Sequence, residues 1–127
     1  MKGTTLPAWE LPVTPTLVVS TAIATRDYQD VHHDRDLAQQ KGSPDIFMNI
    51  LTTNGFVGRF VGEWAGPEHV LRRVAIRLGA PNYPYDTMTM RGRVTAKDDS
   101  AKMVTVEVVG SNKLGDHVTG SVEVALP

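Results

Sequence analysis

The feature that most restricts the fold is a change of hydrophobic period near residue 70. Before it, residues 49–65 repeat apolar side chains at helical spacing. After it, apolar and polar residues alternate, which is typical of strands with one buried face. A long apolar helix and half-buried strands can only bury their apolar sides against each other. The pattern therefore predicts an α+β fold in which a curved antiparallel sheet covers one long helix.

The long helix is expected from about Asn49 to Ala65, closed by Gly66-Pro67. Its apolar face repeats at the helical period and is widened by neighbouring residues: Ile50, Asn54, Val57, Val61 and Trp64, with Leu51, Phe56 and Phe60. Three glycines, Gly55, Gly58 and Gly62, each cost about 0.8–1 kcal/mol relative to alanine. Close approach of another backbone would offset that cost, and a fraying helix is the alternative.

Four strands are expected after residue 70, and one side of each carries apolar residues. These are Val74, Ile76 and Leu78; Met88, Met90 and Val94; Val104, Val106 and Val108; and Val118, Val122, Val124 and Leu126. The polar segments 97–100 and 112–116 between the last three have the composition of hairpin turns. We therefore expect an antiparallel meander.

The N-terminal half predicts shorter elements. Residues 8–11 are compatible with a short strand, and Thr14-Pro15 has the pattern of an N-cap followed by proline at the first helical position. The following residues 16–25 are ambiguous, because their β-branched side chains favour a strand while their apolar spacing favours a helix. Residues 36–41 predict one or two helical turns, ended by Gly42-Ser43-Pro44.

Length and composition describe an ordinary globular protein. The 127 residues fit a single domain, 1–127, with 41% hydrophobic and 21% charged residues. A net charge of −1 argues against a nucleic-acid or anionic-membrane partner. The chain has no cysteine, no run near the roughly 18–20 apolar residues of a membrane span, and no signal-peptide pattern. We therefore expect a cytoplasmic protein.

The chemistry-bearing residues are concentrated between Arg26 and Asp34. Asp27 and His32 lie five positions apart, and a helix end followed by a turn can aim both at one point. A carboxylate and an imidazole that converge suit general acid–base catalysis. The alternative is a solvated loop with helix caps. A metal site is not expected, since adjacent histidines such as His32 and His33 rarely bind one ion and no cysteine is present.

The segment Asp27 to Asp34 resembles the hydratase motif of MaoC-like hotdog proteins, whose usual form is Asp-x-Asn-Pro-(Ile/Leu)-His-x-Asp. Gln29 and Asp30 stand where Asn-Pro is usual, so the loop differs from the common form. Within that family, the chain is most similar to the small subunits of actinobacterial steroid enoyl-CoA hydratases. The similar segments cover nearly the full chain: Ala22–Asp34, Gly42–Leu51, Tyr83–Thr87 and Asn112–Val118.

The resemblance implies a hotdog fold, a helix over residues 16–25, and hydration of a 2-enoyl-CoA in steroid (cholesterol side-chain) degradation. It implies that Asp27 is the base and proton carrier and that His32 holds the same water. The backbone N–H of Asn49, at the start of the central helix, would bind the enolate oxygen, where relatives carry His-Gly in place of Met48-Asn49. A plain helix N-cap is the other interpretation of Asn49. No cofactor is implied, because the coenzyme A thioester is the substrate.

Other residues are weaker candidates. An acyl pocket would be lined by aromatic and apolar residues near the motif and on the helix, for which core packing is the alternative: Tyr28, Phe47, Met48, Phe56 and Trp64. Coenzyme A phosphates would meet Arg26, Arg59 or Lys113, which are otherwise solvated cations. We expect His33 to face solvent, and Asp34 to cap a turn or orient an imidazole.

The resemblance also implies a partner chain, because family members pair so that sites form between chains. We expect a second MaoC-like subunit in a heterotetramer, or a homodimer, with this chain as the catalytic member. The alternatives are a thioesterase and a non-catalytic subunit. Hotdog thioesterases place a carboxylate on the central helix, where only Glu63 lies, and a non-catalytic subunit would support an active partner.

Overall fold

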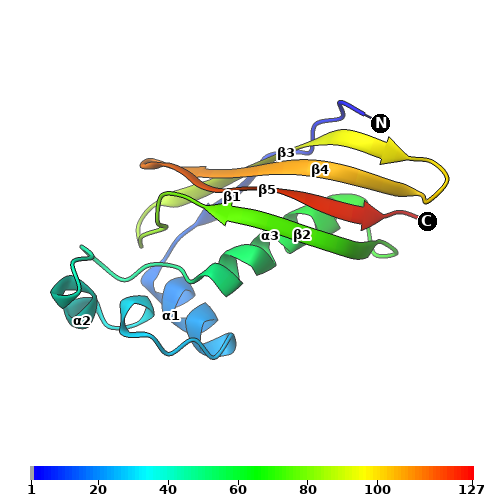
Figure 1. Cartoon of the computed structure of the whole chain (residues 1–127). Helices are drawn as coiled ribbons and strands as arrows, with labels where there is room; N and C mark the ends of the chain where they lie inside the picture. The colour runs from blue at the N-terminus through cyan, green and yellow to red at the C-terminus, as the bar shows by residue number, and fades with distance from the viewer. Residues whose placement is uncertain (1) are drawn as a thin grey trace.

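The computed structural model describes residues 2–127, so Met1, the first residue of the expected domain, lies outside it. One five-stranded sheet covers the long helix α3 (Ile50–Ala65), as Figure 1 shows. The strands are β1 (Trp9–Pro12), β2 (Val70–Leu78), β3 (Thr87–Asp98), β4 (Met103–Asn112) and β5 (Gly115–Ala125). Three short helices gather near the start of α3: α1 (Pro15–Ala24), η1 (Asp30–His32) and α2 (Arg35–Gln40).

The sheet is antiparallel with strand order β1-β3-β4-β5-β2. Strands β3, β4 and β5 form the expected meander, but the expectation that β2 continues it is wrong. β2 pairs with β5, where Val74 lies opposite Val122, and β1 takes the other edge, where Trp9 lies opposite Met90. The segment 79–86 is longer than a hairpin turn, and it carries the chain from one edge of the sheet towards the other.

The apolar faces predicted for β3, β4 and β5 form the core. Their buried side chains are Met88, Met90, Val94, Val104, Val106, Val108, Val118, Val122 and Val124. Each fully buried side chain of this kind contributes about 1.5–3 kcal/mol. Val74 and Ile76 are only half-buried and Leu78 is exposed, because β2 is an edge strand.

Helix α3 faces the sheet with a stripe that includes Val57, Phe60 and Val61, as predicted. The prediction is wrong for its first turns, where Ile50, Leu51 and Asn54 are exposed. Polar side chains take the buried positions there instead, since Thr52 and Thr53 are both buried. The prediction of a close backbone approach at the three glycines is wrong, because the neighbours are side chains: an added Cβ would lie 3.0 Å from the His69 ring at Gly62 and 3.5 Å from Leu71 at Gly58, and it would meet nothing within 4 Å at Gly55.

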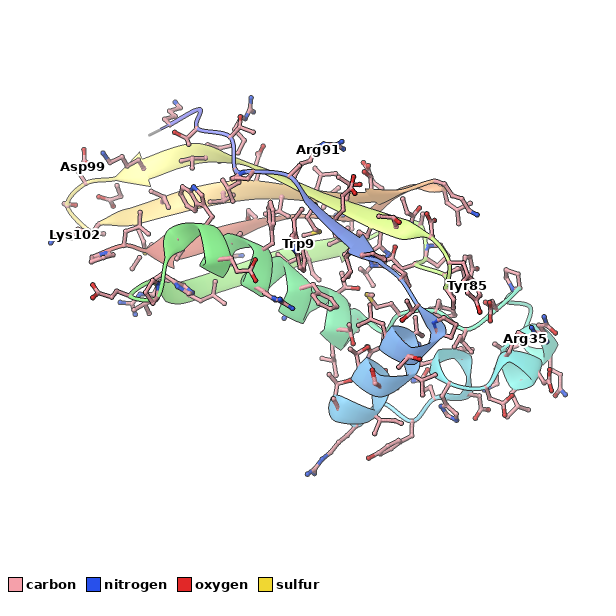
Figure 2. All side chains as sticks on the ribbon, turned by 180° about the vertical axis from the view of Figure 1, so that it is seen from behind. Trp9, Arg35, Tyr85, Arg91, Asp99 and Lys102 are labelled. Atoms are coloured by element: carbon pink, nitrogen blue, oxygen red, sulfur yellow. The ribbon has the colours of Figure 1, made fainter. Side chains whose placement is uncertain are left out.

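The predicted N-terminal elements are present. The Thr14 Oγ1 accepts a hydrogen bond of 3.0 Å from the Leu17 N–H, and Pro15 begins α1, so residues 16–25 are mainly helical. In the reverse view of Figure 2, Trp9 of β1 points toward α3, where its ring lies 5.8 Å from Phe56 and 6.3 Å from Phe60. Within residues 2–127, no helix is long and apolar enough to cross a membrane.

Candidate active site

The end of α1 sets the position of Asp27. The Arg26 N–H donates to the Ile23 carbonyl at 3.0 Å, and the Asp27 N–H donates to the Ala22 carbonyl at 2.9 Å. These two bonds form a Schellman motif, which turns the chain sharply at a helix C-terminus. Arg26 occupies its left-handed position with φ of 58°, where an L side chain costs roughly 1–2 kcal/mol. The turn directs Asp27 back toward the chain that follows.

The short helix η1 brings His32 to the same place. The Gln29 N–H donates to Asp27 Oδ1 at 3.4 Å, and the His32 N–H donates to the Gln29 carbonyl at 3.1 Å. As a result, His32 Nε2 lies 3.4 Å from Asp27 Oδ2. The imidazole is buried, whereas the Asp27 side chain keeps 19% of its surface exposed. Solvent therefore reaches the pair mainly at the carboxylate of Asp27.

The hydrogen bond at the other ring nitrogen fixes the tautomer of His32. His32 Nδ1 lies 2.7 Å from the Phe47 carbonyl oxygen, which can only accept, so Nδ1 carries the hydrogen. The Phe47 N–H donates in turn to the Val31 carbonyl at 3.0 Å, and the two rings meet edge to face at 5.0 Å. In the neutral imidazole, Nε2 therefore presents a lone pair beside Asp27.

Asn49 connects the pair to helix α3. Its side chain is 1% exposed, and all its hydrogen-bonding groups have partners. The Nδ2 group donates to Thr25 Oγ1 at 2.8 Å and to Asp27 Oδ2 at 3.3 Å. Its Oδ1 accepts the Thr52 N–H at 3.2 Å and also the Thr52 hydroxyl. One side chain thus joins the end of α1, the carboxylate of Asp27 and the first turn of α3.

The start of α3 lies beside Asp27 for the same reason. Asn49 is the N-cap, and the first helical hydrogen bond runs from the Thr53 N–H to the Asn49 carbonyl at 3.2 Å. The amides at a helix start have no intrahelical partner, and the helix dipole adds positive potential there. Asn49 therefore both caps the helix and lies where an N–H can meet a negative oxygen.

The other candidates fall into two groups. Close to the pair lie Arg26 and Tyr28, both exposed, and Phe47, which contacts His32. Phe56 and Arg59 line a groove of about 220 Å³ between α1 and α3 that reaches Thr25 and Thr52. Away from the pair lie Trp64 and Lys113, whereas Met48, between Phe47 and Asn49 in the chain, directs its side chain into the core.

Those three have other surroundings. Met48 is buried in the core, and its sulfur accepts from Asn82 Nδ2 at 3.7 Å. Trp64 lines a depression with Trp9 near the other end of α3. Lys113 is exposed in the turn between β4 and β5. Arg59, although beside the groove, also pairs with Glu63 at 2.9 Å.

The last two residues of the motif, His33 and Asp34, lie apart from the pair and have simple roles. His33 is exposed, and Asp34 caps α2 by accepting the Leu37 N–H at 3.1 Å. Within residues 2–127, no three His, Cys, Asp or Glu side chains are grouped so as to hold a metal ion.

A buried imidazole near the start of α3 is not among the residues predicted for the site. His117 of β5 is 2% exposed, and it lies 2.7 Å from the Ala80 carbonyl through Nδ1 and 2.8 Å from Thr53 Oγ1 through Nε2. Burial lowers the pKa of His117, although the hydrogen bond to Ala80 acts in the opposite direction. Because Val118 belongs to the inward set of β5, simple alternation predicts an outward side chain for His117, and no sequence signal identifies Thr53 as its partner.

This pKa shift predicts a loss of stability on acidification. In the unfolded chain His117 titrates near its ordinary value of 6.5, whereas in the folded chain its pKa is lower. As the pH falls through 6.5, the unfolded state binds a proton that the folded state does not, so the free energy of unfolding decreases. Urea unfolding at a series of pH values should show this decrease in the wild type, and His117→Gln should reduce it. His33→Gln removes an exposed imidazole and should show the same decrease in the free energy of unfolding as the wild type. An equal decrease in all three proteins would contradict the role of His117.

The chain resembles a known protein family, a characterised protein and a solved structure. A model of the MaoC like domain matches residues 2–114. The 3-oxo-4,17-pregnadiene-20-carboxyl-CoA hydratase beta subunit of Mycobacterium tuberculosis is 55% identical over 124 residues, which are 98% of this chain and 95% of that protein. A chain in the crystal structure of the ChsH1-ChsH2 complex from M. tuberculosis has a TM-score of 0.97 and 54% identity, covering 100% of this chain and 98% of its own length.

A more distant solved structure shares the fold. The (R)-hydratase from A. caviae involved in PHA biosynthesis has a TM-score of 0.88 at 19% identity, covering 100% of this chain and 97% of its own. The α+β hotdog fold expected from the sequence is confirmed.

Proposed function

The chain belongs to the MaoC-like domain family, and on that premise we propose that it is an enoyl-CoA hydratase. The reaction adds water across the C2=C3 bond of a 2-enoyl-CoA thioester. The observation that carries the assignment is the convergence of Asp27 and His32 at 3.4 Å beside the N-terminus of α3. A base, a second group on the same water and an amide donor are what the reaction requires.

The tautomer of His32 determines how water would be held. A water beside both groups can donate one hydrogen to Asp27 and the other to the lone pair of His32 Nε2. Its oxygen lone pair then points away from the protein groups, toward C3 of the substrate. Asp27 takes one proton as the C–O bond forms at C3, and the same proton is delivered to C2. The water is consumed and Asp27 ends ionised, as it began.

Negative charge collects on the thioester oxygen as the C–O bond forms. We assign the Asn49 N–H as its donor, because the helix start has unpaired amides and a favourable dipole. One donor of this kind is worth about 10²–10³ in rate in other enzymes. Asn49 carries a side chain where relatives carry glycine, and the structure shows where that side chain goes: toward Thr25, Asp27 and Thr52, all on the protein side.

We further propose a steroid side-chain acyl-CoA as substrate and a second MaoC-like chain as partner, in a heterotetramer. The 55% identical relative is named as a pregnadiene carboxyl-CoA hydratase beta subunit, and the similar solved structure is of a two-protein complex. Exposed apolar side chains flank the catalytic pair in this chain, which supports a covering partner: Ile23, Tyr28, Ile50 and Leu51. A homodimer is the alternative assembly.

The remaining assignments are proposals of the same kind. Phe47 and Phe56 are placed to contact an acyl group, and Arg26 and Arg59 to meet coenzyme A phosphates. We take residues 1–127 as one MaoC-like domain that works in the cytoplasm without a cofactor.

The two rival functions are less well supported. A thioesterase would use a carboxylate on the central helix, but Glu63 lies near the far end of α3, exposed and paired with Arg59. A non-catalytic subunit would not need Asp27, His32 and Asn49 held together by hydrogen bonds.

The decisive assay uses the chain purified with its partner from the native host and a panel of 2-enoyl-CoA substrates, from short linear to steroid. We expect 3-hydroxyacyl-CoA, identified by the mass of one added water, with the highest kcat/KM on steroid side chains. Release of free CoA without a hydroxyacyl product would point to a thioesterase. Full activity of the partner alone would show that this chain is non-catalytic.

A further inference from the structure

We propose that His117 is a positioning residue for the amide end of α3, because its imidazole bonds the two segments that enclose the Met48–Asn49 peptide. These segments are the first turn of α3 and the loop 79–82. The inference rests on the proposed function, since it concerns the amide assigned to the enolate oxygen.

The bond between His117 and Thr53 fixes the start of helix α3. The Ala80 carbonyl can only accept, so His117 Nδ1 carries the hydrogen at 2.7 Å, and the neutral ring leaves Nε2 as an acceptor. The Thr53 hydroxyl therefore donates to Nε2 at 2.8 Å, and its other acceptor, the Asn49 carbonyl, is farther away at 3.4 Å. Thr53 also makes the first helical bond, from its N–H to the Asn49 carbonyl at 3.2 Å. The hydroxyl of Thr53 therefore ties the beginning of α3 to strand β5.

The bond between His117 and the Ala80 carbonyl fixes the loop 79–82. The Gly79 N–H donates to the His117 carbonyl at 2.8 Å, and His117 Nδ1 holds the Ala80 carbonyl. The loop then continues to Asn82, whose carbonyl accepts the Met48 N–H at 3.1 Å. Asn82 is buried, so this bond cannot be exchanged for one to bulk water. The loop thus holds Met48, immediately before the proposed oxyanion amide.

Asn112 supports the same loop from β4. Its Nδ2 group donates to the Pro81 carbonyl at 3.0 Å and to Asn82 Oδ1 at 2.8 Å. Asn82 Nδ2 in turn donates to the sulfur of Met88 at 3.2 Å. With these contacts the loop is anchored on the three strands β3, β4 and β5, and His117 is the residue whose side chain also reaches the helix.

The geometry of this amide should affect the rate more than the affinity. An oxyanion donor acts when it lies about 2.7–3.1 Å from the oxygen in the transition state, so a small displacement weakens the transition state more than the bound substrate. Displacements near 1 Å can cost about 10²-fold in rate. A residue that only stabilised the fold would change the amount of folded enzyme instead.

The test uses paired variants in the assembled enzyme. Thr53→Val keeps the shape of the side chain but removes the donor to His117, and Thr53→Ser restores it. His117→Asn keeps a donor near the Nδ1 position but lacks the acceptor. Val124→Ala is the control, because it opens a cavity in the buried part of β5 without touching either segment.

We expect Thr53→Val and His117→Asn to lower kcat by roughly 10-fold or more, with KM changed less than about 3-fold. Thr53→Ser and Val124→Ala should keep kcat within about 3-fold of the wild type. Wild-type kcat in Thr53→Val, or equal losses in Thr53→Ser and Val124→Ala, would overturn the inference.

Amide hydrogen exchange at residues 48–50, measured on the same proteins, separates this inference from the proposed function. Exchange should be faster in Thr53→Val and His117→Asn and unchanged in Thr53→Ser and Val124→Ala. If the wild-type assembly hydrates no enoyl-CoA, the proposed function fails while exchange still reports whether His117 orders this peptide. Equal exchange in all five proteins would refute the positioning role.

Discussion

Asp27→Asn is expected to lower kcat for hydration by about 10²–10⁴-fold, equivalent to about 2.7–5.4 kcal/mol of barrier. The amide of asparagine is almost the same shape as the carboxylate but cannot take a proton from water. The NH₂ group of the asparagine could also take the position of Oδ2, which now accepts from Asn49 Nδ2 and lies beside His32 Nε2. It cannot accept a hydrogen bond there. Both effects act on the proton transfer, so kcat should fall more than KM rises.

Asp30→Asn is the matched control, since it makes the same chemical change three residues away. Asp30 is paired with Lys41 at 3.1 Å on the surface, and surface pairs of this kind contribute little. Steady-state kinetics on enoyl-CoA should therefore show a large loss for Asp27→Asn and a change within about 3-fold for Asp30→Asn. Comparable activity in the two variants would remove Asp27 from the mechanism.

His32→Ala is expected to lower kcat by about 10²–10³-fold. The loss has two causes: the lone pair of Nε2 no longer orients the water, and the Phe47 carbonyl loses its buried donor at 2.7 Å. The second cause also affects stability, by about 1–3 kcal/mol for an unsatisfied buried carbonyl. The kinetic effect therefore needs a variant that keeps this bond.

His32→Asn separates the two causes, because its amide can reach the Phe47 carbonyl from near the Nδ1 position but not Asp27. We expect this variant to unfold near the wild-type urea concentration and still to lose most of its activity. His33→Ala, which removes the exposed neighbouring imidazole, should behave like the wild type in both measurements. Activity in His32→Asn close to that of the wild type would mean that only the Phe47 contact matters.

Periodicity predicted most of the fold because the inward faces of β3, β4 and β5 are mainly alternating and apolar. It failed where spatial order departs from chain order. Nothing in the alternation of Val74 and Ile76 distinguishes pairing with β3 from pairing with β5, and the length of segment 79–86 was the one available indication. The exposed Ile50 and Leu51 were misplaced because two buried threonines take the inward positions at the start of α3.

The candidate site was predictable to the extent that its residues are close in sequence. Asp27 and His32 form a recognisable motif, and Asn49 followed from the resemblance and the helix start. Thr25, Thr53 and His117 could not be found in this way, because their contacts join segments far apart in the chain. A left-handed Arg26 was also unforeseen, since arginine carries no signal for that backbone conformation.

The buried amide of Asn49 has a consequence for how this site can change over generations. Thr25, Asp27 and Thr52 all depend on the same four hydrogen-bonding positions of one side chain. Free energies of double variants among these four residues should therefore depart from the sum of the single ones, as contacting residues usually do. A homologue that replaces Asn49 by glycine must find new partners for Thr25 and Thr52 at the same time, so these positions are expected to vary as a set.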